Sequence, residues 1–287
     1  LFTTQGMEKF ISGVILFDET LRQSSLADGE KYPDYLKKLG VIPGIKVDKG
    51  AHPLSGSEEE KVTEGLDGLS SRLKEYYDLG ARFAKWRAVI TIGESAPSGA
   101  CLAANAHALA RYAALCQENG IVPIVEPEIL MEGDHTIEES FIVTEEVLHA
   151  TFYELNSQNV LLEGMVLKPN MVLSGYGCSE QASVDEVAEM TVTVLKRCVP
   201  SAVPGIAFLS GGQSDEDATA HLNKMNQILG NNNPWNLTYS YGRALQAPAL
   251  AAWGGKQENV KKAQDAFYKR AKLNSLATKG EYASDME

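Results

Sequence analysis

Seven short apolar runs rich in β-branched residues alternate along this chain with longer stretches of helical periodicity. The runs begin about 30 to 45 residues apart, the length of a strand and a crossover helix, so they predict parallel strands joined in βαβ units. The predicted strands span residues 11–16, 43–47, 83–92, 121–125, 161–167, 205–209 and 237–241. The predicted helices span residues 60–79, 98–119, 136–155, 184–199, 214–229 and 256–276.

The apolar runs have no polar face, which indicates strands that are covered on both sides. A doubly wound open sheet could hold seven such strands, whereas a closed barrel needs eight. The length of 287 residues is near the roughly 250 that are usual for a (β/α)8 TIM barrel. If the fold is this barrel, we expect a single domain over residues 1–287, with one strand upstream of Leu1.

Composition excludes several classes of protein. The 26 Lys and Arg against 38 Asp and Glu give a net charge of −12, which argues against a nucleic-acid binder held by a basic surface. No run approaches the roughly 18 consecutive apolar residues of a membrane helix, so no membrane association is expected. Four scattered cysteines suit a reducing, cytoplasmic compartment, with a plastid as the alternative. The five histidines are dispersed, so no catalytic metal is expected.

Charged residues interrupt four of the apolar runs near their carboxyl ends, in three cases as pairs two residues apart. They are Lys46 with Asp48, Lys85 with Arg87, Glu126 with Glu128, and Lys168. Side chains two apart on a strand face the same way, and parallel α/β folds carry their sites at the carboxyl ends of strands. One such residue is more often a solvated rim position or a structural ion pair, but four strands that agree favour a functional site.

The chemistry of this set points to a lysine nucleophile. Lysine becomes nucleophilic near neutral pH when burial or neighbouring cations lower its pKa, and Lys168 could have Lys46 and Lys85 as such neighbours. The glutamates could move protons. A Schiff base with a carbonyl substrate is the reaction that such a site suits.

A phosphate site is predicted at the ends of the last two strands. Ser210, Gly211 and Gly212 lead from one strand into a helix, where backbone N–H groups can approach an anion. The next strand ends in Ser240, Tyr241, Gly242 and Arg243, whose guanidinium can contact phosphate through two N–H groups. TIM barrels often bind phosphate after their last two strands.

At these residues the chain resembles a known family, the class I fructose-1,6-bisphosphate aldolases. The similar segments, in order along nearly the whole chain, are GIKVDKG (44–50), GLDGLS (65–70), RFAKWR (82–87), NGIVPIVEPEIL (119–130), LEGMVLKPNMV (162–172), FLSGGQS (208–214) and SYGRALQ (240–246). Val166 departs from the family pattern, which usually has Leu or Ser there. A C-terminal tail ending in tyrosine, usual in the family, has no counterpart here, so we expect the full polypeptide to be longer at both ends.

The resemblance implies a (β/α)8 barrel, usually a homotetramer, that cleaves fructose 1,6-bisphosphate to dihydroxyacetone phosphate and glyceraldehyde 3-phosphate without metal or other cofactor. It makes Lys168 the Schiff-base lysine and Glu126 the general acid/base, with Lys85 assisting and Glu128 positioning and polarising the lysine. The residues that it implies in binding the ketose 1-phosphate are Ser210, Gly211, Gly212, Ser240, Gly242 and Arg243. It places Lys46 and Arg87 near the other phosphate or the rim of the site.

Two alternatives stay open at this stage. Another Schiff-base aldolase acting on a phosphorylated ketose would use the same lysine and phosphate-binding residues. A non-catalytic scaffold is the alternative from a different class, because members of the family bind actin. No separate motif in the sequence marks an actin-binding surface.

Overall fold

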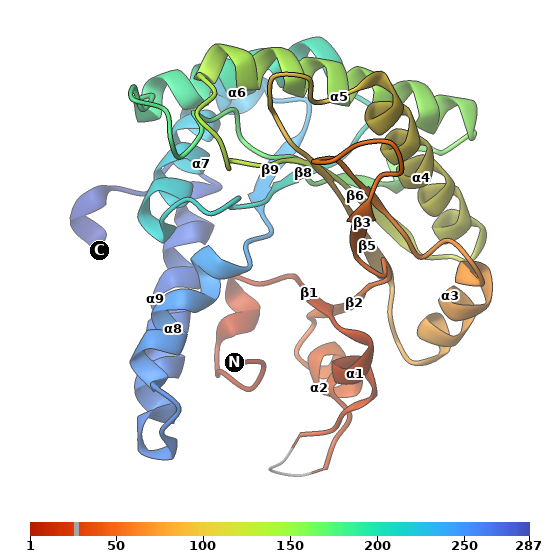
Figure 1. Ribbon diagram of the computed structural model, residues 1–287. Helices are drawn as coiled ribbons and strands as arrows, with labels where there is room; N and C mark the ends of the chain where they lie inside the picture. Colours follow the sequence, from red (N-terminus) through yellow and green to blue (C-terminus); the bar gives the residue numbers. More distant parts are fainter. Residues whose placement is uncertain (26–28) are drawn as a thin grey trace.

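Seven parallel strands form one curled sheet, which the computed structural model describes over residues 1–25 and 29–287 (Figure 1). Each strand pairs with the next one of the sheet, in the order β1-β2-β5-β6-β7-β8-β9. The strands are β1 (Gly13–Leu16), β2 (Ile42–Lys46), β5 (Phe83–Ile90), β6 (Val122–Ile129), β7 (Val166–Leu167), β8 (Gly205–Phe208) and β9 (Asn236–Tyr239). A doubly wound sheet reverses its strand order at a switch point, and this order never reverses, so the barrel prediction is the correct one.

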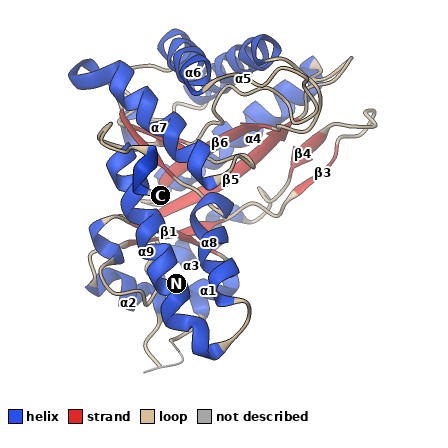
Figure 2. Cartoon of the chain, turned by 90° about the vertical axis from the view of Figure 1, so that its left-hand side faces the viewer, coloured by secondary structure: helices blue, strands red, loops and turns tan. Residues whose placement is uncertain are grey.

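The helices lie outside the curled sheet, as Figures 1 and 2 show from two directions. They are α1 (Asp18–Arg22), α2 (Tyr32–Lys38), α3 (Leu69–Asp78), α4 (Gly99–Glu118), α5 (Ile137–Ser157), α6 (Val184–Cys198), α7 (Asp215–Leu229), α8 (Arg243–Trp253) and α9 (Val260–Ala277). Ser214 caps α7 by accepting a hydrogen bond from the N–H of Asp217 at 3.0 Å, which confirms the predicted start of that helix. Among the described residues, no helix is long and apolar enough to span a bilayer.

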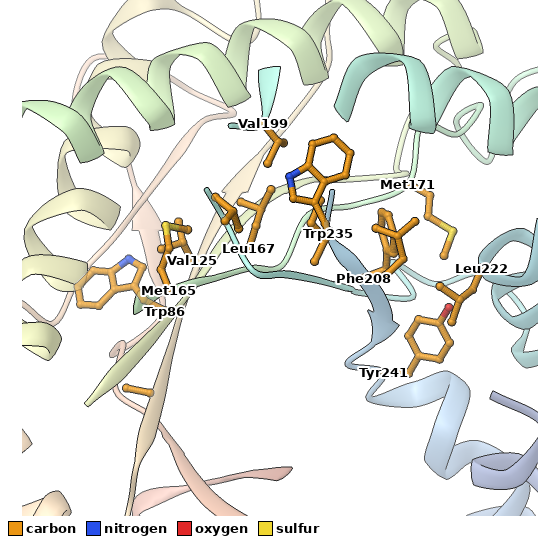
Figure 3. Close-up of a cluster of buried hydrophobic side chains, with 14 of the residues drawn as sticks. Trp86, Val125, Met165, Leu167, Met171, Val199, Phe208, Leu222, Trp235 and Tyr241 are labelled. Carbon is orange, nitrogen blue, oxygen red and sulfur yellow. The ribbon is translucent and has the colours of Figure 1, made fainter. Parts of the chain in front are cut away.

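The pleat of β5 separates the core from the predicted site. Trp86 is fully buried and stacks on Tyr112 of α4, with ring centroids 5.6 Å apart. Its neighbours Lys85 and Arg87 point to the opposite face, because successive side chains alternate along a strand. Leu167 and Phe208 continue the buried cluster along the sheet (Figure 3). The packing that fixes the sheet therefore also fixes where the charged residues emerge.

One predicted helix is partly wrong. Residues 60–79 were expected to be helical throughout, but the structure has a hairpin of β3 (Ala51–Pro53) and β4 (Lys61–Thr63), and the helix covers only α3. Gly68 interrupts the helical pattern because it lies in the left-handed region, with φ of +66°. Glu60, the first residue of the predicted helix, is buried before β4 and accepts hydrogen bonds from the N–H and hydroxyl of Ser98, both at 2.6 Å.

Several other boundaries differ from the predicted ones. Strand β6 continues through Glu126 and Glu128, whereas the prediction ended at Val125. The predicted strand over 161–167 shortens to β7, preceded by a 3₁₀ turn over Leu162–Gly164. Helices α1, α2 and α8 were not predicted, and α8 contains Pro248, a residue that normally argues against a helix interior.

Candidate active site

Lys168, Glu126 and Lys85 form the centre of the site. The carboxylate of Glu126 lies between two ammonium groups, with Lys168 Nζ at 3.0 Å and Lys85 Nζ at 2.8 Å. All three side chains are less than 10% exposed. Lys168 follows β7 directly, and its N–H donates to the carbonyl of Val125 at 2.7 Å, which holds it beside β6. The predicted convergence of these three residues is confirmed by this geometry.

Burial and charge act in opposite directions on the two central groups. Burial lowers the pKa of Lys168, Glu126 opposes this change, and the nearby Lys85 lowers the pKa further. Burial alone would raise the pKa of Glu126, but Lys168 and Lys85 outweigh it and hold the pKa below its usual range. The site therefore combines an ionised, buried carboxylate with a lysine that gives up its proton more easily than a solvated lysine.

The other strand-end charges form ion pairs around this centre. Asp48 bonds Lys46 through one oxygen, while its second oxygen lies 3.7 Å from Lys85 Nζ. Glu128 bonds the guanidinium of Arg87, and this contact raises the pKa of Arg87. The family resemblance implies that Glu128 positions and polarises Lys168, whereas the direct partner of Glu128 in the structure is Arg87.

The glycine-rich loop after β8 lies against a tyrosine and an arginine. The hydroxyl of Tyr176 donates to the carbonyl of Gly211 at 3.3 Å. A Cβ built on Gly212 would lie 1.8 Å from that hydroxyl oxygen and 3.2 Å from Nη2 of Arg243. Gly212 also has φ of +104°, so both its conformation and its surroundings require glycine. The loop and Arg243 are thus adjacent, as predicted.

His221 of α7 contacts the same loop through Gln213, which precedes the helix. Gln213 donates from Nε2 to the carbonyl of Ser210 at 2.9 Å, and its Oε1 lies 2.6 Å from Nδ1 of His221 on α7. Burial lowers the pKa of His221 to about 4, so the ring is neutral near pH 7. The ring can then donate one hydrogen bond from Nδ1 to the amide oxygen.

A cavity of about 470 Å³ opens onto the site between the two edge strands of the described sheet, β1 and β9. Six of the predicted residues line it: Lys46, Lys85, Arg87, Lys168, Ser240 and Gly242. Glu126 and Glu128 lie behind the lysines and Arg87 that they bond. Ser210, Gly211, Gly212 and Arg243 are not among the lining residues of this cavity.

Two features of the site were not predicted from the sequence. Tyr176 lies in a loop with no periodicity, and its position depends on backbone bonds between two loops, such as its own N–H to the carbonyl of Met131 at 2.8 Å. His221 was noted only as one of five dispersed histidines. Its position in the second turn of α7, facing back toward Gln213, was the only signal that could have marked it.

Comparison with known proteins identifies the family to which the chain belongs. The family model described as fructose-bisphosphate aldolase class-I matches residues 1–287. The chain belongs to the class I fructose-bisphosphate aldolase family. It is accordingly a lyase that cleaves fructose 1,6-bisphosphate reversibly into dihydroxyacetone phosphate and glyceraldehyde 3-phosphate, by the Schiff-base mechanism general to class I.

Similar proteins support this membership over most of the aldolase chain. A probable fructose-bisphosphate aldolase class 1 of Xanthomonas campestris pv. campestris is 60% identical over 283 residues, covering 98% of this chain and 84% of the relative. Fructose-bisphosphate aldolase 6, cytosolic, of Arabidopsis thaliana is 58% identical over 287 residues, covering 99% and 79%. The solved fructose-bisphosphate aldolase of Plasmodium falciparum, in complex with TRAP and a small-molecule inhibitor, superposes with a TM-score of 0.96 at 52% identity, covering 99% and 82%.

Proposed function

We propose that Lys168 forms the Schiff base of this aldolase. Three features support this assignment: burial depresses its pKa, Lys168 lines the cavity, and Glu126 lies 3.0 Å away to exchange protons with it. The neutral amine attacks the ketone carbon of fructose 1,6-bisphosphate, and the resulting carbinolamine loses water to give an iminium ion. Glu126 delivers the proton that lets the hydroxyl leave as water.

The iminium ion then accepts the electrons of the bond that breaks. The C4 hydroxyl gives its proton to Glu126, which is a carboxylate again after the dehydration, as the C3–C4 bond cleaves; glyceraldehyde 3-phosphate departs, and the electron pair moves to the iminium nitrogen to give an enamine. Protonation of the enamine and hydrolysis of the new iminium release dihydroxyacetone phosphate and restore Lys168. In this proposal Lys85 assists proton transfer through Glu126, and Glu128, bonded to Arg87, positions the cationic side of the site.

We infer that the two phosphates bind on opposite sides of Lys168. Arg243, the backbone of Gly211 and Gly212, and the neighbouring residues Ser210, Ser240 and Gly242 would hold the phosphate of the dihydroxyacetone half. Their support is the adjacency of Arg243 to the glycine loop. Lys46 and Arg87 would contact the second phosphate, since both line the cavity from β2 and β5, on the other side of β7 from β8 and β9. This site would belong to one barrel domain, because all seven parallel strands share a sheet.

The single observation that carries the catalytic assignment is the Glu126 carboxylate held between Lys85 and Lys168. Borohydride reduction with dihydroxyacetone phosphate, followed by peptide mapping, should place the trapped adduct on Lys168. Lys168→Met should lose the adduct and the cleavage activity. Lys224→Met is the matched control, because Lys224 pairs with Asp185 on the outer helices. An adduct on another lysine, or normal turnover in Lys168→Met, would refute the assignment.

The assembly and its location belong to the same proposal. We infer a homotetramer in the cytoplasm, on the family resemblance and on relatives whose names call them cytosolic or cytoplasmic. Sedimentation equilibrium would test the tetramer. Binding to actin, the alternative role, would be tested by co-sedimentation with filaments, using the Lys168→Met variant to separate it from catalysis.

A further inference from the structure

The outer helical layer carries three metal-ligating side chains that the aldolase reaction does not use. Glu145 and His149 lie on α5, and Cys198 is the last residue of the adjacent helix α6 (Figure 1). One ligand atom from each of the three lies within 4.8 Å of the others, and this is the one such group of three among the residues that the structure describes. We propose that Glu145, His149 and Cys198 form a zinc-binding site that joins α5 to α6.

Helix geometry creates half of this site. Residues four apart lie one above the other on the same face of a helix, so Glu145 and His149 present a carboxylate and an imidazole to the same neighbour. That neighbour is Cys198, whose Sγ lies 3.6 Å from Nε2 of His149 and 3.9 Å from the backbone carbonyl of Glu145. All three donors therefore converge without any change of secondary structure.

The spacing of the sulfur and nitrogen donors matches what zinc requires. With a zinc–sulfur distance of about 2.3 Å and a zinc–nitrogen distance of about 2.05 Å, a tetrahedral angle places sulfur and nitrogen about 3.6 Å apart. The separation between Cys198 Sγ and His149 Nε2 has this value. A carboxylate oxygen supplies a third ligand, and the exposed side of His149 leaves room for water as the fourth.

The donor set selects zinc over the common hard cations. Calcium and magnesium prefer oxygen ligands, whereas a thiolate with an imidazole favours zinc and similar metals. Arg197 bonds one carboxylate oxygen of Glu145 at 3.2 Å and so orients the carboxylate. The thiol of Cys198 must release its proton to solvent when zinc binds. Burial and the nearby Glu145 raise the pKa of that thiol to about 11, so the metal-free residue is an uncharged thiol.

The experiment uses the full chain after removal of metals with a chelator. Titration with Zn²⁺ should show one tightly bound ion per chain, and Co²⁺ in its place should give the absorption of tetrahedral cobalt with a thiolate ligand. Cys198→Ser and His149→Ala should weaken Zn²⁺ binding at least about 100-fold, because even changes behind the direct ligands cost about 10- to 100-fold. His149 is exposed, so its replacement does not threaten folding.

Two variants serve as matched controls. Cys178→Ser removes another free cysteine, and His107→Ala removes an exposed histidine that contacts Glu154 at 3.1 Å. Both should keep the parental affinity, and Cys198→Ser should keep the parental turnover of fructose 1,6-bisphosphate. Absence of tight Zn²⁺ binding, a cobalt spectrum without thiolate absorption, or unchanged affinity in Cys198→Ser would each overturn the proposal and leave only a thiol–imidazole hydrogen bond.

Discussion

Replacing Glu126 by Gln removes the carboxylate that contacts both buried lysines, and among the described residues Lys85 then keeps only the more distant Asp48 at 3.7 Å. The oxygens of Glu126 lie 2.8 Å from Lys85 Nζ and 3.0 Å from Lys168 Nζ. At an effective dielectric constant of about 20, each contact is worth about 5 to 6 kcal/mol before the cost of dehydrating the ions is subtracted. Removing one partner of a buried ion pair generally costs about 3 to 5 kcal/mol, and we expect a loss of that size in the free energy of unfolding at pH 7.

This loss in the free energy of unfolding has an upper limit, because a lysine without its counter-ion can release its proton. Starting from an ordinary pKa near 10.4, neutralising one lysine at pH 7 costs about 5 kcal/mol, and each unit rise in pH lowers that cost by about 1.4 kcal/mol. In the variant, the folded state therefore binds fewer protons than the unfolded state below pH 10.4. Stability rises with pH wherever the unfolded state binds more protons. The gap in unfolding free energy between the variant and the parent protein should therefore narrow between about pH 7 and 9.

Urea unfolding followed by tryptophan fluorescence at several pH values measures this gap. Glu128→Gln is the control, since Glu128 bonds Arg87 and a guanidinium does not release its proton in this range. The Glu128→Gln gap should stay constant while the Glu126→Gln gap shrinks. Cleavage activity of Glu126→Gln should fall by about 10²- to 10⁴-fold, the usual contribution of a general acid/base. A Glu126→Gln gap that is constant or widens with pH would refute the charge-balance argument.

Two further outcomes are expected around the phosphate loop. His221 has its pKa lowered to about 4, so the folded protein resists its protonation, and unfolding free energy should fall by about 3 kcal/mol as the pH drops from 6.5 to 4. His221→Gln should flatten that part of a pH series, and an unchanged slope would contradict this account. Gly212→Ala places a methyl group 1.8 Å from the Tyr176 hydroxyl oxygen and should raise KM at least tenfold (about 1.4 kcal/mol). Adding Tyr176→Phe should recover part of that loss in steady-state assays; no recovery would show that backbone strain at Gly212 dominates.

The sequence allowed the cationic strand ends to be predicted because the relevant signals are local. Period-two alternation puts Lys85 and Arg87 on one face, and parallel strands bring their carboxyl ends to one edge. Which carboxylate bonds which lysine or arginine was not predictable from β5 and β6 alone, because the pairing also depends on a side chain that follows a third strand, β7. In the register, Arg87 is opposite Glu126, yet Glu126 bonds Lys85 and Lys168 while Arg87 bonds Glu128. Lys168 on the far side of β6 supplies the second cation that the register alone does not show.

Helix α8 and the hairpin of β3 and β4 were not predicted, because contacts with residues distant in the sequence stabilise them. Helix α8 contains Pro248, and its packing on α9 outweighs the local penalty of a proline in a helix. The hairpin of β3 and β4 is stabilised from outside its own sequence, since Asn105 of α4 accepts from the N–H of Thr63 at 3.3 Å and donates to the carbonyl of Lys61 at 2.8 Å. Neither contact is visible in a window of neighbouring residues.

Counting charges explains how a site in an acidic protein can receive an anionic sugar. The strand-end set has four cations and three carboxylates, a net charge of +1 when all are ionised, in Lys46, Lys85, Arg87, Lys168, Asp48, Glu126 and Glu128. A sugar bisphosphate brings more negative charge than this surplus, since each phosphate carries about −1.5 to −2 at pH 7. Lys46 and Arg87 already bond carboxylates, so each must divide its hydrogen bonds between that carboxylate and a phosphate. This division reduces the binding free energy that each contact with the phosphate contributes. Among the described residues no ion pair is formed by Arg243, so its guanidinium can bind a phosphate without giving up a carboxylate. We therefore expect Arg243 to contribute more to substrate affinity than Lys46 or Arg87 does.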